Sequence, residues 1–107
     1  GNGTQSRDFV HVSDVVNANI LSMTSNIKHA FFNVGTNSSI TILDLAKTII
    51  DASGLNLEPK FRDALEGDVD KTLSDISLIN KEIGWEPTIR LEDWLKKMIT
   101  SKEIDEV

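Results

Sequence analysis

The 107-residue chain contains no cysteine and no tyrosine, only two prolines, and fewer basic residues (11) than acidic ones (17). Without cysteine it forms neither a disulfide nor a thiolate metal site, a composition that fits a reducing cytoplasm. No apolar run approaches the roughly 18 residues of a membrane-spanning helix. The net charge of −6 argues against general binding to nucleic acids or anionic membranes. An anionic ligand would therefore have to be held by a few placed basic side chains.

The length predicts one small domain over residues 1–107, with a radius of about 13 Å if it is compact. Hydrophobic residues make up 39% of the chain, an ordinary globular value. Short strand-like segments alternate with helical patterns, so we expect a mixed α/β fold with several helices and short strands.

The clearest predicted helix follows Thr41. Thr41 and Asp44 form a capping-box-like pair, apolar residues then recur at helical spacing as far as Ile50, and Gly54 ends the helix. Further helices are predicted over residues 77–83, before a glycine, and from Leu91 onward.

Three strands are predicted, over Val10–Val12, Ala30–Val34 and Glu58–Arg62. The first leads into a helix that we expect Ser13 or Asp14 to cap. The lone histidines lack the partners that a metal site needs. His11 is expected to pack on the first strand, and Trp85 to lie in the core because large aromatics dominate small cores.

Arg7 stands in the polar opening of the chain, just before the first predicted strand. A guanidinium held at the edge of a rigid element grips phosphate or carboxylate well, because its planar fork donates parallel hydrogen bonds. The alternative is an exposed ion pair with neighbouring Asp8, which would contribute little.

This opening, GTQSRDFVHVSDVVNA, resembles the RDF stretch of nucleoside-diphosphate-sugar epimerases and dehydratases, the extended short-chain dehydrogenase/reductases. Three later segments resemble the same family in the same order. They lie at 31–49, 66–77 and 83–99, the last containing the GW-x-P pattern. The resemblance covers most of the chain and implies a C-terminal substrate-binding lobe.

The family uses a tyrosine general base in a Y-x-x-x-K motif, which this chain lacks. The opening Gly1-Asn2-Gly3 imitates a dinucleotide fingerprint, but Ser6 occupies the third glycine position and no strand precedes it. We therefore expect a C-terminal piece of a longer enzyme, whose N-terminal Rossmann domain binds NAD and carries the tyrosine. The lobe alone is expected to bind no NAD and to be inactive. It is expected to contain no catalytic, cofactor-binding or metal-binding residue.

The resemblance also implies substrate-binding residues. Arg7 would contact the diphosphate of a nucleotide sugar, and Asp68 would accept hydrogen bonds from the ribose hydroxyls. The alternative for Asp68 is a turn aspartate after Gly67. The family's second arginine is replaced by Leu65, and Arg62 could reach the same phosphate instead. Gly35 is expected only to relieve backbone strain.

We therefore expect the substrate-binding part of an NAD-dependent epimerase similar to UDP-glucose 4-epimerase. A 4,6-dehydratase, a reductase of the same superfamily and a non-catalytic α/β interaction module remain alternatives, and the base and sugar stay open. Val16, Ile20 and Met23 share one helical face that would normally meet the Rossmann domain. Self-association of the isolated lobe, or partial disorder of residues 1–24, is therefore expected.

Overall fold

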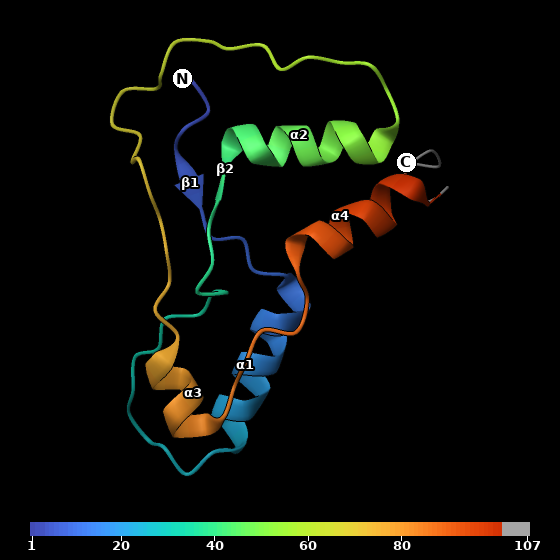
Figure 1. Cartoon of the computed structure of the whole chain (residues 1–107). Coiled ribbons are helices and arrows are strands. Elements are labelled where there is room, and N and C mark those ends of the chain that lie inside the picture. The colour runs from blue at the N-terminus through green and yellow to red at the C-terminus, as the bar shows by residue number, and fades with distance from the viewer. Residues whose placement is uncertain (102–107) are drawn as a thin grey trace.

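A computed structural model of the chain describes residues 1–101. Within this range four helices accompany a two-stranded sheet, a mixed α/β arrangement as predicted. In chain order the elements are β1 (Ser6–Arg7), α1 (Val12–Thr24), β2 (Ile40–Thr41), α2 (Ile42–Ser53), α3 (Ser77–Ile83) and α4 (Leu91–Thr100). Figure 1 shows α1 beside α3 at one end of the molecule and α2 beside α4 at the other, with the sheet next to the start of α2.

Strand β1 is central because chain segments bond to both of its edges. On one edge it runs antiparallel to β2, with Ser6 opposite Thr41 and Arg7 opposite Ile40. On the other edge the Ser6 N–H donates to the Asp70 carbonyl (2.8 Å), and the Thr72 N–H donates to the Ser6 carbonyl (3.0 Å). This edge brings residues near 70 against Arg7, more than sixty positions earlier in the chain.

The local predictions for α2, α3 and α4 are confirmed. The Thr41 hydroxyl accepts from the Asp44 N–H (3.1 Å) at the start of α2, and Gly54 ends this helix with a φ of 70°. Helix α3 covers the predicted residues 77–83 and ends at Gly84 (φ 69°), and α4 begins at Leu91. Each of these boundaries depends on residues within one helical turn, which is why sequence patterns find them.

The three predicted strands are wrong. Val10–Val12 leads directly into α1, whose N-cap is His11: the imidazole Nδ1 accepts from the Ser13 N–H (3.0 Å). Neither Ser13 nor Asp14 is the cap, and His11 lies on no strand. Residues 30–34 and 58–62 form no strand in the described chain. Strand propensity reflects packing against a neighbour, and these segments have no strand beside them.

The core is small and lies between α1 and α3. Ala18, Ile79 and Trp85 are its buried hydrophobic residues, and the prediction of a core role for Trp85 is confirmed. Four partly buried side chains pack around them: Phe32, Val34, Ile76 and Ile83. Irregular segments, which supply Phe32, Val34, Ile76 and Trp85, therefore contribute as much to this core as the helices do.

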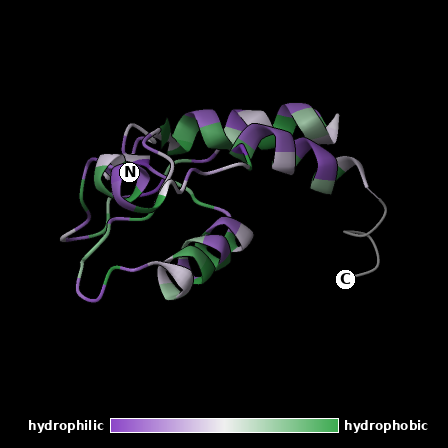
Figure 2. Ribbon diagram, turned by 90° about the horizontal axis from the view of Figure 1, so that it is seen from below, coloured by the Kyte–Doolittle hydropathy of each residue, from purple (hydrophilic) through white to green (hydrophobic). Residues whose placement is uncertain are grey.

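The molecule is more open than predicted. Its radius of gyration is 16.8 Å and its extents are 52 × 36 × 20 Å, because the two helix pairs do not share one core. The segment between α2 and α3 crosses the periphery without helix or regular strand (Figure 1) and carries exposed apolar side chains, among them Phe61 and Leu65. In Figure 2 hydrophobic residues, drawn in green, occur along the irregular segments as well as on the helices. None of the described helices is long and apolar enough to cross a membrane.

Candidate functional site

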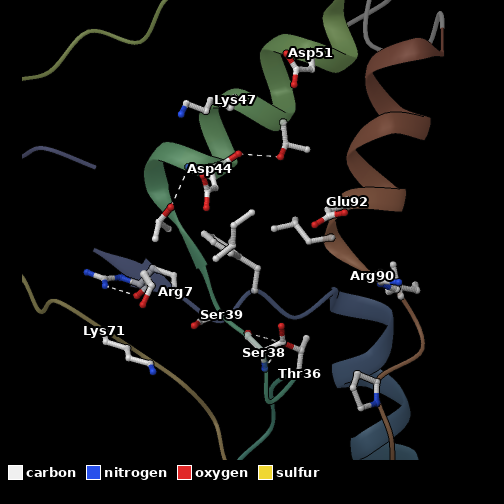
Figure 3. A pocket seen from close by; sticks show the side chains of 18 of the residues that line it. Arg7, Thr36, Ser38, Ser39, Asp44, Lys47, Asp51, Lys71, Arg90 and Glu92 are labelled. Carbon is white, nitrogen blue, oxygen red and sulfur yellow. Dashed lines mark hydrogen bonds between the residues drawn. The ribbon is translucent and has the colours of Figure 1, made fainter. Parts of the chain in front are cut away.

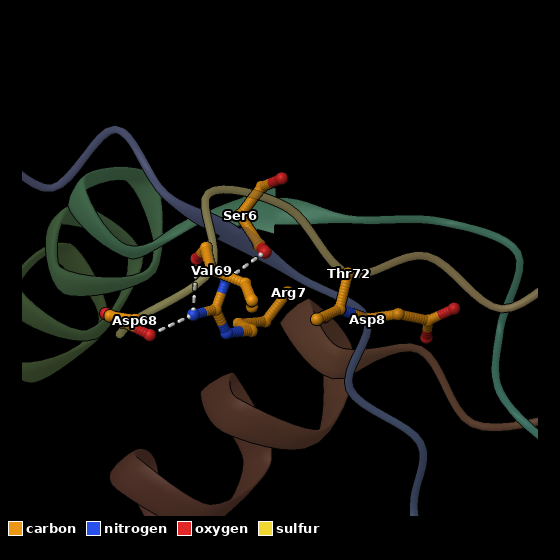
Figure 4. A network of polar contacts seen from close by, with 6 residues as sticks. All are labelled: Ser6, Arg7, Asp8, Asp68, Val69 and Thr72. Carbon is orange, nitrogen blue, oxygen red and sulfur yellow. Dashed lines mark hydrogen bonds and ion pairs between the residues drawn. The ribbon is translucent and has the colours of Figure 1, made fainter. Parts of the chain in front are cut away.

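The Arg7 side chain makes an ion pair with Asp68, its Nη2 atom lying 2.6 Å from Oδ1. The same nitrogen donates to the Val69 carbonyl (2.7 Å), and Nη1 donates to the Ser6 carbonyl (2.7 Å). Figure 4 shows the guanidinium held among these three acceptors, while the Asp8 carboxylate points away from it. The two residues that sequence resemblance assigns to one ligand are thus in direct contact, and Asp8 is not the partner of Arg7.

This pair is open to solvent, since the Arg7 and Asp68 side chains are 22% and 33% exposed. A guanidinium carries more N–H groups than these hydrogen bonds use, so part of the fork remains available for an anion. An exposed ion pair contributes little stability. The pair instead orients Arg7, because Asp68 and two backbone carbonyls fix the plane of the guanidinium.

Asp8, which sequence reasoning left without a role beyond pairing with Arg7, holds two distant segments together. Its carboxylate accepts from the Thr36 N–H (2.9 Å), the Thr36 hydroxyl (2.6 Å), the Asn37 N–H (3.1 Å) and the Ser74 N–H (3.1 Å). The sequence signal that could have pointed to Asp8 was its position directly after Arg7. The donors themselves lie 28 to 66 positions away, where no spacing rule could find them.

Gly35 makes this junction possible through its size. A Cβ atom there would lie 2.4 Å from the Ser74 Cβ and 3.0 Å from the Asp8 Oδ2. Its φ is outside the left-handed region, which Gly3, Gly54, Gly67 and Gly84 occupy. The prediction that Gly35 relieves backbone strain is therefore wrong, since the glycine provides space for Ser74 to approach.

A cleft of about 840 Å³ lies beside this network, between the sheet, α2 and the start of α4 (Figure 3). Its charged lining residues are Arg7, Lys47, Lys71 and Arg90, against Asp44, Asp51 and Glu92. Hydroxyl groups line the side nearest β1, including those of Ser6, Ser38 and Ser39. A polar ligand could be held here by hydrogen bonds and a slight excess of positive charge.

Asp14 builds one wall of this cleft indirectly. It is fully buried, and its carboxylate accepts from the Thr88 hydroxyl (2.8 Å) and from the N–H groups of Thr88 and Ile89 (both 3.1 Å). Burial alone would raise the pKa of Asp14, but these hydrogen bonds and the nearby His11 together lower the pKa below its ordinary 3.8. Asp14 thus fixes residues 88–89, which line the cleft, to the start of α1.

Arg62, the third predicted binding residue, lies exposed on the segment between α2 and α3 and does not line the cleft. Leu65, which stands where the family arginine was expected, is 79% exposed. Within residues 1–101 the ion pair to Asp68 comes from Arg7 and not from Arg62. The structure therefore brings two of the three predicted residues together.

The GDP-mannose 4,6 dehydratase family matches residues 1–98 of the chain. The chain belongs to this family. It is 32% identical over 99 residues to a putative UDP-glucose 4-epimerase of Methanocaldococcus jannaschii, an alignment that covers 92% of the chain and 32% of that protein. Other relatives are dTDP-4-dehydro-6-deoxyglucose reductase of Escherichia coli and UDP-glucuronic acid decarboxylase 1 of Arabidopsis thaliana.

Solved structures of the family superpose closely. UDP-glucose 4-epimerase of Thermotoga maritima with UDP-glucose gives a TM-score of 0.88 at 35% identity, over 99% of this chain and 33% of that one. MoeE5 with UDP-glucose and NAD gives 0.88 at 30% identity, over 100% and 36%. The chain thus spans about a third of the length of these relatives. The resemblance to nucleotide-sugar epimerases and dehydratases is confirmed at the level of the family.

Proposed function

We propose that the chain is the C-terminal substrate-binding part of an NAD-dependent nucleotide-sugar epimerase similar to UDP-glucose 4-epimerase, with residues 1–107 forming one domain. The observation that carries this proposal is the contact between Arg7 and Asp68. It sits in a chain that superposes over nearly its whole length on an epimerase solved with UDP-glucose.

In this proposal Arg7 donates to the nucleotide diphosphate and Asp68 accepts from the ribose hydroxyls. Because Asp68 and the Val69 carbonyl already orient the Arg7 guanidinium, this group needs little rearrangement when the ligand binds. Arg62 supplies a weaker second contact in place of the arginine expected at Leu65. The lobe thus contributes to catalysis by positioning the sugar rather than by reacting with it.

The chain's own residues do not fit a dinucleotide. A dinucleotide pyrophosphate binds at a glycine-rich turn between a strand and a helix, whereas β1 passes to α1 through residues 8–11, which include no glycine. We therefore assign NAD to a part of the enzyme outside this chain.

A reductase or a dehydratase acting on a nucleotide sugar is the second candidate, because a dTDP-sugar reductase is 32% identical over 95 residues. Both candidates use the same diphosphate grip, so Arg7 and Asp68 keep their roles. Family membership favours either enzyme over a non-catalytic interaction module.

The test is the Arg7→Ala substitution in the full-length enzyme that contains this chain. Loss of one charge-assisted contact costs about 1.5–3 kcal/mol, so UDP-glucose affinity should fall by roughly tenfold to a hundredfold in calorimetric titration. Arg62→Ala is the matched comparison and should have a smaller effect. Unchanged affinity for Arg7→Ala with a larger loss for Arg62→Ala would show that the diphosphate lies on the other arginine.

A further inference from the structure

We infer that Asp8 is a positioning residue for nucleotide-sugar binding, which sets the geometry of the Arg7–Asp68 pair without touching the ligand. The inference rests on the proposed function and adds to it a residue that works through the chain segment carrying Asp68.

The segment 68–74 has no regular strand or helix of its own, apart from one bridge between Lys71 and Ser6. Three consecutive residues of the chain opening hold it in place. Arg7 binds Asp68 and the Val69 carbonyl, Ser6 bonds through its backbone to Asp70 and Thr72, and Asp8 accepts from the Ser74 N–H. The position of Asp68 is therefore set from β1, and Asp8 provides the anchor at the far end.

The same Asp8 carboxylate binds the loop after Gly35. It accepts from the Thr36 N–H and hydroxyl and from the Asn37 N–H. Asn37 has a φ of 55°, in the left-handed region that few non-glycine residues adopt. A carboxylate that receives several N–H and O–H donors forms strong, charge-assisted hydrogen bonds. Asp8 thus connects the 68–74 segment to the loop at residues 36–37 through hydrogen bonds to both.

Arg7 and Asp8 project in opposite directions from adjacent positions, as Figure 4 shows. A ligand on the Arg7 side therefore meets the guanidinium and Asp68, while the Asp8 carboxylate is taken up by Thr36, Asn37 and Ser74. Any effect of Asp8 on the ligand is therefore indirect, through the 68–74 segment or through the loop at residues 36–39 that lines the cleft.

Asp8→Asn tests this role with a minimal change of shape. An amide has only one acceptor oxygen. Its NH₂ group would face N–H groups that now donate to the carboxylate, and two donors cannot bond to each other. The 68–74 segment should lose its anchor and Asp68 its fixed distance to Arg7. In the full-length enzyme we expect the KM for UDP-glucose to rise about tenfold or more while kcat changes less, because misplacement of a binding group is costly. The affinity for UDP, measured separately by calorimetry, should fall in parallel.

Asp75→Asn is the matched control. Asp75 is also a carboxylate that accepts from one hydroxyl and one backbone N–H, but both donors belong to Ser77 at the start of α3, and Asp75 does not line the cleft. Asp8→Asn should raise KM and weaken UDP binding, whereas Asp75→Asn should leave both unchanged. If Asp8→Asn does not fold, Thr36→Val removes the hydroxyl that donates to Asp8 (2.6 Å) and also bonds to Ser38, and should give a smaller rise in KM at unchanged kcat.

Arg7→Ala, measured in the same assays, distinguishes failure of the proposed function from failure of the positioning role of Asp8. If Arg7→Ala leaves UDP affinity unchanged, the proposed function is wrong. If Arg7→Ala weakens UDP binding but Asp8→Asn or Thr36→Val behaves like Asp75→Asn, the binding role of Arg7 stands and the positioning role of Asp8 is wrong.

Discussion

The indole nitrogen of Trp85 lies 2.9 Å from the backbone carbonyl oxygen of Asp14 and donates a hydrogen bond to it. The Asp14 carboxylate meanwhile accepts from Thr88 and Ile89. One residue of α1 therefore holds two points of the segment that joins α3 to α4. Because few other side chains are buried, we expect this junction to contribute strongly to the stability of the described chain.

Trp85→Phe should destabilise the chain by about 1–3 kcal/mol, because the ring is largely kept but the Asp14 carbonyl loses its donor in a buried setting. Trp85→Ala should cost about 3–5 kcal/mol, since a cavity is added. Urea unfolding followed by circular dichroism measures both. Trp94→Phe, at a position 36% exposed, is the control and should cost less. Equal losses at the two tryptophans would contradict this account of the core.

Stability should depend on pH through Asp14. Its folded pKa lies below the ordinary 3.8, so the ionised form is favoured by folding. This contribution is complete well above pH 3.8 and is lost as pH falls through the lower folded pKa. Urea midpoints from neutral pH downward should therefore fall in acid for the native chain, and the Asp14→Asn variant should show a shallower fall.

Asp75→Asn serves as the control for that titration. Ser77 donates two hydrogen bonds to Asp75, which also lower its pKa, but this carboxylate is exposed on the surface. Its substitution should change the acid limb less than that of Asp14. An unchanged acid limb in Asp14→Asn would show that other carboxylates govern the acid sensitivity.

The isolated chain should self-associate through α1. Val16, Ile20 and Met23 are 48%, 51% and 83% exposed on this helix, and exposed apolar faces of this kind tend to find a partner. Ile20→Lys should shift sedimentation toward the monomer without lowering the unfolding midpoint, whereas Lys81→Ala on α3 should not. A sharp monomer for the unchanged chain, with full hydrogen-exchange protection of residues 1–24, would oppose this prediction.

The isolated chain should carry no NAD and should not interconvert UDP-glucose and UDP-galactose. The reasons are the absence of tyrosine from the sequence and the absence of a glycine-rich turn between β1 and α1. Absorbance and mass spectrometry of the purified chain, with a coupled epimerase assay, test both statements. Stoichiometric NAD in the purified material would overturn the assignment of the cofactor to another part of the enzyme.

Much of the helical structure could be predicted from the sequence because its determinants are local. Thr41 caps α2 through an N–H three residues on, and Gly54 and Gly84 end their helices in the left-handed region. The same reasoning failed for Val10–Val12, since a strand needs a neighbour that the local pattern does not supply. The resemblance marked Arg7 and Asp68 separately, as two residues of one family site.

Only the tertiary structure decided how those residues meet. Arg7 and Asp68 lie 61 positions apart, and the Asp8 carboxylate collects donors from 28 to 66 positions away. Asp14, which resembles a helix cap in the sequence, turned out to bind residues 88 and 89. Helix signals act over three or four residues, within reach of a sequence pattern. Side-chain contacts between distant segments depend on which parts of the chain folding brings together.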